Sequence, residues 1–201
     1  MRFCDTSRRK AGILAEHVDP REQNDDHLRQ AMQAVAAGNE NAFRVIAEAL
    51  EPRLARFFAQ LGVPEADRDD LYQESCLRLY RAAGTYDPGR PFLPWALTVA
   101  RRVTLNWHRA RKPTWPLEDA GDVQSRERPP SEAAETDLWQ FARARLSPAA
   151  YELLWLCYGE DLEPAEIAAV SGRTAVHVRV LLYRARASLA SALDKAGETD
   201  R

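Results

Sequence analysis

Apolar residues recur at helical spacing along most of this chain, and strand-like alternation of apolar and polar residues is not evident. The spacing predicts four helices in the first half, over residues 26–37, 40–61, 65–83 and 92–112. Four more are expected in the second half, over 138–146, 148–157, 164–170 and 175–192. Pro52 is expected to kink the second helix or to begin a new one, because proline removes a backbone donor. The pattern therefore predicts an all-α protein.

Two stretches without helical period flank the predicted helices. Residues 1–25 mix charges of both signs and are interpreted as a disordered extension. Residues 113–137 are acidic and carry a Pro-Pro pair, which is typical of a flexible linker. The sequence thus predicts two small helical domains, over 26–112 and 138–195, joined by a flexible acidic linker.

The positions of the charged residues along the chain are more informative about function than the net charge. A formal net charge of -2 would argue against a nucleic-acid-binding protein, because affinity for DNA comes largely from neutralising phosphates. Acidic residues, however, gather in the linker and at the start of the third predicted helix. In the net charge they cancel the positive charge of basic helices elsewhere in the chain. Three cysteines without paired spacing argue against a disulfide framework and a structural zinc site. We expect a cytoplasmic protein that needs no metal or cofactor and has no membrane-spanning segment.

The fourth predicted helix carries an apolar face and a basic face. Its apolar side is formed by Phe92, Trp95, Val99, Val103 and Trp107. No Asp or Glu is present in this helix, so the charged residues on its other side are all basic: Arg101, Arg102, His108, Arg109 and Lys112. A solvated face normally mixes both signs, so the single sign indicates an anionic partner.

The end of the chain has the pattern of a helix-turn-helix. A short helix over 163–170 is followed by the turn Ser171-Gly172-Arg173, and Thr174 can cap the long helix after it. On that helix Val178, Leu182 and Leu189 are expected to face inward. The outward side is basic and would suit a DNA major groove: His177, Arg179, Arg184 and Arg186. An ordinary helical hairpin with a basic face remains the alternative from this pattern alone.

Taken together, these segments resemble the extracytoplasmic-function (ECF) sigma factors of bacterial RNA polymerase, over residues 28–112 and 146–193. In the first block the resemblance rests on Ala37-Gly38-Asn39-Glu40-Asn41-Ala42-Phe43, on Asp69-Asp70-Leu71-Tyr72-Gln73-Glu74, and on residues 86–95 followed by Ala100-Arg101-Arg102. In the second it rests on Glu166-Ile167-Ala168 and on residues 183–189. The order and separation of these pieces make the match specific.

The resemblance implies a non-enzymatic subunit that binds core RNA polymerase, directs initiation at −10 and −35 promoter elements, and helps to open the −10 region. It implies that the first domain is sigma region 2 and the second is sigma region 4. Polymerase contacts are expected from Asp69, Asp70, Gln73, Glu74 and Arg78. Contacts with −10 DNA are expected from Tyr86, Asp87, Arg90, Arg101, Arg102, Asn106, Arg109, Arg111 and Lys112. Contacts with −35 DNA are expected from Arg173, Thr174, His177, Arg179, Tyr183, Arg184 and Arg186. Factors of this family are commonly restrained by an anti-sigma protein, which is a further expected partner.

Two departures from the family pattern bear on promoter choice. Arg102 and Asn106 stand where the family usually has Asn and Asp, which makes the −10 surface more basic. Val180 and Leu181 stand where polar contacts are usual, so a modest −35 contribution is expected.

Three other functions are weighed against this one. A stand-alone helix-turn-helix regulator would use residues 26–112 as a sensor, but a sensor needs a ligand pocket and no second anion-binding face. An enzyme is not supported, because the histidines have no ligand spacing and neither a Gly-rich phosphate loop nor a nucleophile motif is evident. An interaction protein that merely mimics a sigma domain would not support promoter-specific transcription.

Overall fold

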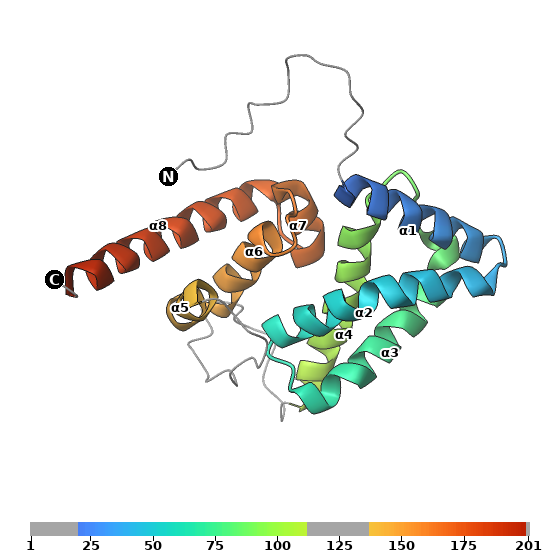
Figure 1. Cartoon of the computed structure of the whole chain (residues 1–201), viewed down its shortest axis with the longest axis horizontal. Coiled ribbons are helices and arrows are strands. Elements are labelled where there is room, and N and C mark those ends of the chain that lie inside the picture. Colours follow the sequence, from blue (N-terminus) through green and yellow to red (C-terminus); the bar gives the residue numbers. More distant parts are fainter. Residues whose placement is uncertain (1–19, 112–136, 200–201) are drawn as a thin grey trace, which may run out of the picture.

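The computed structural model describes residues 20–111 and 137–199, and this part of the chain is helical apart from its turns and connecting loops. The first group of helices is α1 (Pro20–Ala36), α2 (Phe43–Gln60), α3 (Glu65–Arg81) and α4 (Phe92–Arg111), with the short 3-10 turns η1 (Glu40–Ala42) and η2 (Ala83–Thr85). The second group is α5 (Asp137–Arg145), α6 (Pro148–Tyr158), α7 (Pro164–Ser171) and α8 (Ala175–Thr199). The predicted all-α class is confirmed (Figure 1). No helix within the described ranges is long and apolar enough to cross a membrane.

Two features differ from the sequence-based expectation. The first helix begins at Pro20 and not at residue 26, so the last residues of the expected disordered extension are helical. The second helix continues through Pro52, so no new helix begins there. Leu50 and Leu54 on either side of Pro52 are fully buried, and their packing holds the helix together across the missing backbone donor. Residues 1–19, Lys112 and all of the expected linker except Asp137 lie outside the described residues.

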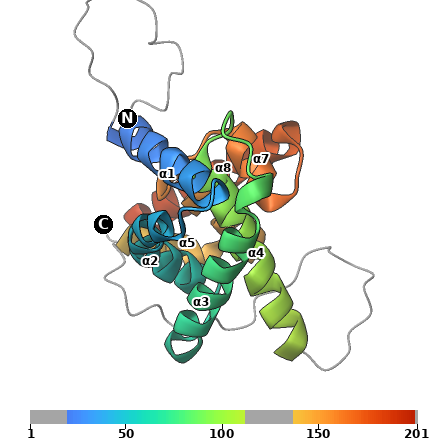
Figure 2. The same cartoon turned by 90° about the vertical axis from the view of Figure 1, so that its right-hand side faces the viewer.

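The first group of helices packs around buried side chains that all four of its helices contribute. α2 packs against both α1 and α3, and α3 also packs against α4 (Figures 1 and 2). The side chains at the centre are completely buried and come from all four helices: Met32, Ile46, Phe58, Leu79 and Leu97. This arrangement leaves the outer side of α3 and the C-terminal part of α4 open to solvent.

The second group forms the predicted helix-turn-helix. The Ser147 hydroxyl accepts a hydrogen bond from the amide of Ala150 at 3.3 Å and so caps α6. α7 ends at Gly172, whose φ of 71° is a left-handed conformation that favours glycine. α8 then begins after Thr174, whose hydroxyl oxygen accepts a hydrogen bond from the His177 amide at 3.2 Å. The predicted turn and cap are therefore present, and Val178 and Leu182 face inward as expected.

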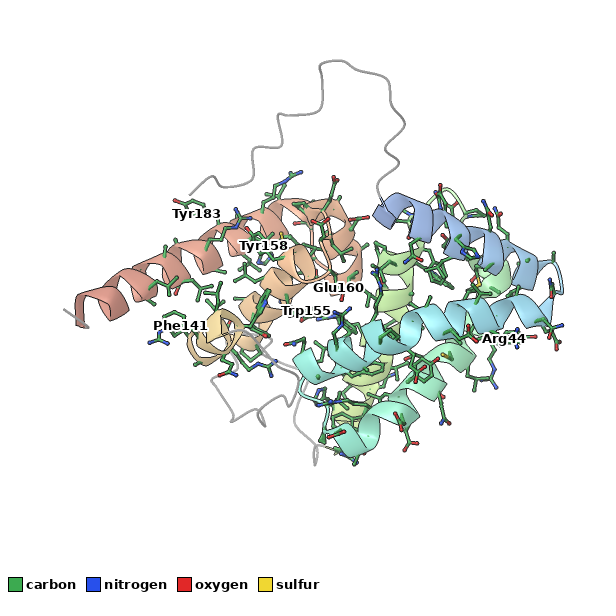
Figure 3. The ribbon with its side chains drawn as sticks, in the orientation of Figure 1. Arg44, Phe141, Trp155, Tyr158, Glu160 and Tyr183 are labelled. Carbon is green, nitrogen blue, oxygen red and sulfur yellow. The ribbon has the colours of Figure 1, made fainter. Side chains whose placement is uncertain are left out.

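The two groups of helices also pack against each other, which the sequence pattern did not predict. α4 lies against α7, and buried residues of both groups belong to one hydrophobic cluster. At the junction the rings of Phe57 in α2 and Trp155 in α6 are 6.0 Å apart. Trp155 and Glu160 lie on the side of the second group that faces the first (Figure 3). The chain therefore forms two helical groups that share an interface.

Candidate polymerase and nucleic-acid interfaces

The 86–91 loop connects η2 to α4 and is held by aromatic packing. The Tyr86 ring lies 4.8 Å from Trp95 and 5.7 Å from Phe92, and its hydroxyl donates a hydrogen bond to the Arg90 carbonyl oxygen at 2.7 Å. Tyr86 is only 8% exposed, and burial raises its pKa to about 12. In this conformation the ring and hydroxyl of Tyr86 make contacts within the protein, and its contact with −10 DNA stays a prediction.

The exposed charged side chains of the loop are Asp87 and Arg90. Oδ1 of Asp87 accepts a hydrogen bond from the Gly89 amide at 2.9 Å, which stabilises the turn. Oδ2 of the same residue lies 3.3 Å from Nε of Arg90. Both side chains are largely open to solvent, so the loop presents one carboxylate and one guanidinium on a fixed backbone.

The residues of α4 that are predicted to contact −10 DNA fall into two sets. Arg102, Asn106 and Arg109 are exposed, and Arg109 donates to the Asn106 side-chain oxygen at 3.3 Å. Arg111, by contrast, makes a two-point contact with the Asp67 carboxylate of α3, at 2.8 and 2.6 Å, while its guanidinium lies 4.4 Å from the Trp107 ring centre.

Arg101 belongs to the paired set as well. Its Nε donates to Oε1 of Glu152 in α6 at 2.6 Å, and the two side chains are only 19% and 12% exposed. The ring Nε2 of His108 lies 3.0 Å from the Leu61 carbonyl oxygen, so this residue also faces the protein. The basic face expected from the sequence is therefore partly neutralised by carboxylates of other elements.

The outer side of α3 carries the predicted polymerase contacts. Asp69, Asp70 and Gln73 are exposed, and Glu74 pairs with Arg78 one turn later at 2.6 Å. Leu77 lies on the same face and is 42% exposed, although the buried residues Leu71 and Leu79 face the opposite way. Leu77 is not among the polymerase contacts predicted from the sequence. Its position on the polar side of the helix is the signal that could have found it.

α8 presents a mixed surface where the −35 contacts are expected. Thr174, His177, Arg179, Tyr183 and Arg184 are exposed, and Arg173 is half-buried. Tyr183 is 70% exposed and projects from the helix away from the first group (Figure 3). Val180 and Val176 are exposed beside it, one and two turns earlier. Leu181, by contrast, is partly buried and packs against the core.

Arg186 differs from the other arginines of α8. Its guanidinium lies 5.9 Å from the ring centre of Tyr158 in α6, and the side chain is half-buried. The expectation that Arg186 points outward to DNA is therefore met only in part. Leu189, expected to face inward, is likewise partly buried.

The junction between the two helical groups is polar as well as apolar. The Tyr151 hydroxyl, on a side chain that is almost fully buried, donates to the side-chain oxygen of Gln60 at 2.7 Å, and Arg143 donates to the same oxygen. Nη1 of Arg53 lies 3.4 Å from Oε2 of Glu160, whose side chain is 2% exposed. With Arg101 and Glu152, these contacts join α2 and α4 to the second group.

Comparison with known proteins identifies the chain. The Sigma-70 region 2 family model matches residues 46–114, which include α3, the 86–91 loop and α4. The ECF RNA polymerase sigma factor SigD of Mycobacterium tuberculosis is 30% identical over 188 residues, which are 86% of this chain and 87% of that protein. The RNA polymerase sigma factor CnrH of Cupriavidus metallidurans is 28% identical over 176 residues, covering 81% of this chain and 92% of CnrH.

Solved structures agree with the sequence comparison. The structure of CnrH in complex with the cytosolic domain of CnrY has a TM-score of 0.62 and 25% identity, and the match covers 84% of this chain and 98% of that one. The sigma factor RpoE of Bartonella quintana, in complex with the anti-sigma factor NepR, has a similar fold with a TM-score of 0.58. The chain belongs to the ECF family of RNA polymerase sigma factors. It is a sigma factor that directs transcription initiation.

Proposed function

We propose that this sigma factor divides its work among three surfaces. The outer side of α3 binds core RNA polymerase, the 86–91 loop and the exposed residues of α4 bind the −10 element, and α8 binds the −35 element. The observation that carries this proposal is the continuity of the −10 surface. A single helix, about 30 Å long at 1.5 Å per residue, links the loop at its N-terminal end to Arg109 near its C-terminal end.

The −10 surface has the chemistry that an opened DNA strand requires. Separating the strands leaves unstacked bases and a phosphate backbone, which are bound by a base pocket and a basic track. The loop offers Asp87 and Arg90 on a backbone fixed by Tyr86, and this supports a role in reading a base. Arg102, Asn106 and Arg109 offer exposed donors to the strand.

The pairing of Arg101 with Glu152 has a consequence for this function. If Arg101 is to contact the −10 strand, its guanidinium must exchange a carboxylate of α6 for a DNA phosphate. This exchange removes one contact between α4 and α6. We therefore infer that strand binding at Arg101 is coupled to the interface between the two helical groups.

The α3 surface combines charge with an exposed apolar side chain. Leu77 lies one turn from Gln73 and Glu74, and such a mixed patch is typical of a protein-binding surface. On α8, Arg179 lies in the early turns that would reach base edges, and Arg184 lies further along, toward the DNA backbone.

We further infer the partners and the setting. CnrH and RpoE were each solved in complex with a second protein, CnrY and the anti-sigma factor NepR respectively, which supports an anti-sigma partner for this chain. The sigma factor family is not generally catalytic, and we propose that this member is not an enzyme. It would act where RNA polymerase acts, in the cytoplasm. A stand-alone helix-turn-helix regulator is not favoured, because the relatives are sigma factors over both halves of the chain.

Transcription in vitro tests this function. The full-length protein is mixed with core RNA polymerase and a promoter library, and the promoters that initiate are then tested with each element scrambled. We expect initiation to require the added protein and to fall more for a scrambled −10 element than for a scrambled −35 element. Initiation that survives −10 scrambling but not −35 scrambling would reverse the ranking of the two surfaces, and no promoter selectivity at all would refute the proposal.

A further inference from the structure

The start of α4 is capped by a side chain from a different helix. Oδ1 of Asp25, in α1, accepts hydrogen bonds from the amides of Phe92 at 2.9 Å and Leu93 at 3.1 Å. Oδ2 is also 3.1 Å from the Phe92 amide. The first amides of a helix have no partner within the helix, and the helix dipole favours a negative charge there. Asp25 thus acts as the N-terminal cap of α4 although it lies 67 positions earlier in the chain.

Arg29, one turn later in α1, holds the loop that precedes α4. Its Nη1 donates a hydrogen bond to the Pro88 carbonyl oxygen at 3.3 Å, and its Nε lies 3.4 Å from Oδ2 of Asp25. It also pairs with Asp26. The same face of α1 therefore contacts both the middle of the 86–91 loop and the helix that the loop enters.

These contacts complete the support of the 86–91 loop. Tyr86 anchors its beginning through Phe92 and Trp95, and the Tyr86 hydroxyl holds the Arg90 carbonyl near its end. Arg29 holds Pro88 between them. The exposed side chains of Asp87 and Arg90 are left on a backbone that is fixed in several places. A binding site whose backbone is fixed before the ligand arrives loses less free energy to ordering, and it discriminates better between similar ligands.

We infer that Asp25 and Arg29 are positioning residues for base discrimination at the −10 element. They do not contact DNA; they set the shape of the 86–91 loop and the start of α4. The inference rests on the proposed function of this loop in base reading. It extends the −10-reading unit to α1, which lies outside the residues 46–114 matched by the family model.

The test uses the full-length protein with core polymerase and a promoter that the wild-type protein selects from the library. Open-complex formation is measured on this promoter and on variants with each single base changed through the −10 element. The readout is the ratio between the preferred base and the worst base at each position. We expect Asp25→Ala to reduce this ratio about tenfold at the position read by the loop and to leave core binding unchanged.

Matched variants separate positioning from a general loss of stability. Asp25→Asn keeps an oxygen that can cap the helix and should retain most of the discrimination. Arg29→Ala leaves the Asp25 cap in place but removes the support of Pro88 and the ion pairs with Asp25 and Asp26, and it should reduce the ratio at the same position as Asp25→Ala. Glu48→Ala removes a carboxylate from a solvent-exposed pair on α2 and should change nothing.

Each result decides the matter. A general loss of stability would lower initiation on all promoters together and leave the base ratios as in the wild type. Wild-type ratios in both Asp25→Ala and Arg29→Ala, with a discriminating wild-type protein, would overturn this inference alone. A wild-type protein that discriminates at no −10 position would instead refute the proposed function together with it. The expected physical cause of reduced discrimination is a more mobile loop backbone. It would be detected as faster amide hydrogen exchange in a peptide spanning residues 86–93 of Asp25→Ala.

Discussion

Glu152 of α6 and Arg101 of α4 form an ion pair in which Nε and Oε1 are 2.6 Å apart, and it joins the two helical groups across the shared interface. A DNA phosphate would offer Arg101 the same kind of partner, because guanidinium groups bind carboxylates and phosphates in similar geometry. If Arg101 binds the −10 strand as proposed, the carboxylate and the strand compete for its guanidinium.

Replacing Glu152 should expose this competition. We expect Glu152→Gln to bind a single-stranded −10 oligonucleotide roughly fivefold more tightly than the wild-type protein, as for the loss of about 1 kcal/mol in a partly exposed ion pair. The measurement is fluorescence anisotropy with the free protein at low salt. Glu48→Gln makes the same charge change on a remote surface and is the control. Equal affinities for the two variants would show that Arg101 does not limit strand binding.

The exposed arginines of α4 should act mainly through the DNA backbone. Arg109→Ala is expected to weaken binding of all strands about equally and to reduce the salt dependence by about 0.7 for each phosphate that is no longer neutralised. The quantity to measure is the slope of log affinity against log salt concentration. Arg44→Ala removes an arginine that is 83% exposed on α2, far from this surface, and should leave the slope unchanged. A base-dependent loss in Arg109→Ala would contradict the assignment.

Polymerase affinity should depend on the outer side of α3. Reversing Asp70 and Glu74 to Lys is expected to abolish core binding while the helical circular dichroism stays as in the wild type. Leu77→Ala alone should weaken binding roughly tenfold, since an apolar side chain of this size contributes about 1.5 kcal/mol or more when buried by a partner. Pull-down and titration with core polymerase give both values. Unchanged binding of the double variant would remove α3 from the polymerase interface.

The arginines of α8 should fail in three different ways. Arg179→Ala is expected to relax discrimination at one or two −35 positions, by about 1–3 kcal/mol if the contact is bidentate. Arg184→Ala should weaken all promoters together, as expected for a phosphate contact. Arg186→Ala should mainly lower the melting temperature, because its side chain packs beside Tyr158. Initiation on base-substituted promoters and thermal melting distinguish these outcomes. If Arg184→Ala lost discrimination at a single −35 position, Arg184 would be the base-reading residue and Arg179 the phosphate contact.

The features predicted from sequence are those fixed within one segment. The cap at Thr174 depends on an amide three residues away, so the local pattern was enough to predict it. The helices were likewise visible in their own apolar period. The expectation that Pro52 begins a new helix was wrong, because the burial of Leu50 and Leu54 on either side of it depends on tertiary packing and offsets the lost hydrogen bond.

The contacts that pattern reasoning missed join distant segments. Glu152 and Arg101 are separated by 51 positions, and no periodicity within α4 indicates that a carboxylate covers Arg101. The burial of Tyr86 depends on how the loop returns toward Trp95. Asp25 stood at the end of a segment without an evident period, and its partners became visible only in the folded chain.

The packing of Phe57 against Trp155 gives the separation of the two helical groups a free-energy cost of its own. A partner that binds only the separated form must supply that free energy, and its apparent affinity is lowered accordingly. Two partners that both require separation would then bind with positive cooperativity, and each would strengthen the other by the same factor. The contact between Phe57 and Trp155 would thereby couple the binding of two partners that do not contact each other.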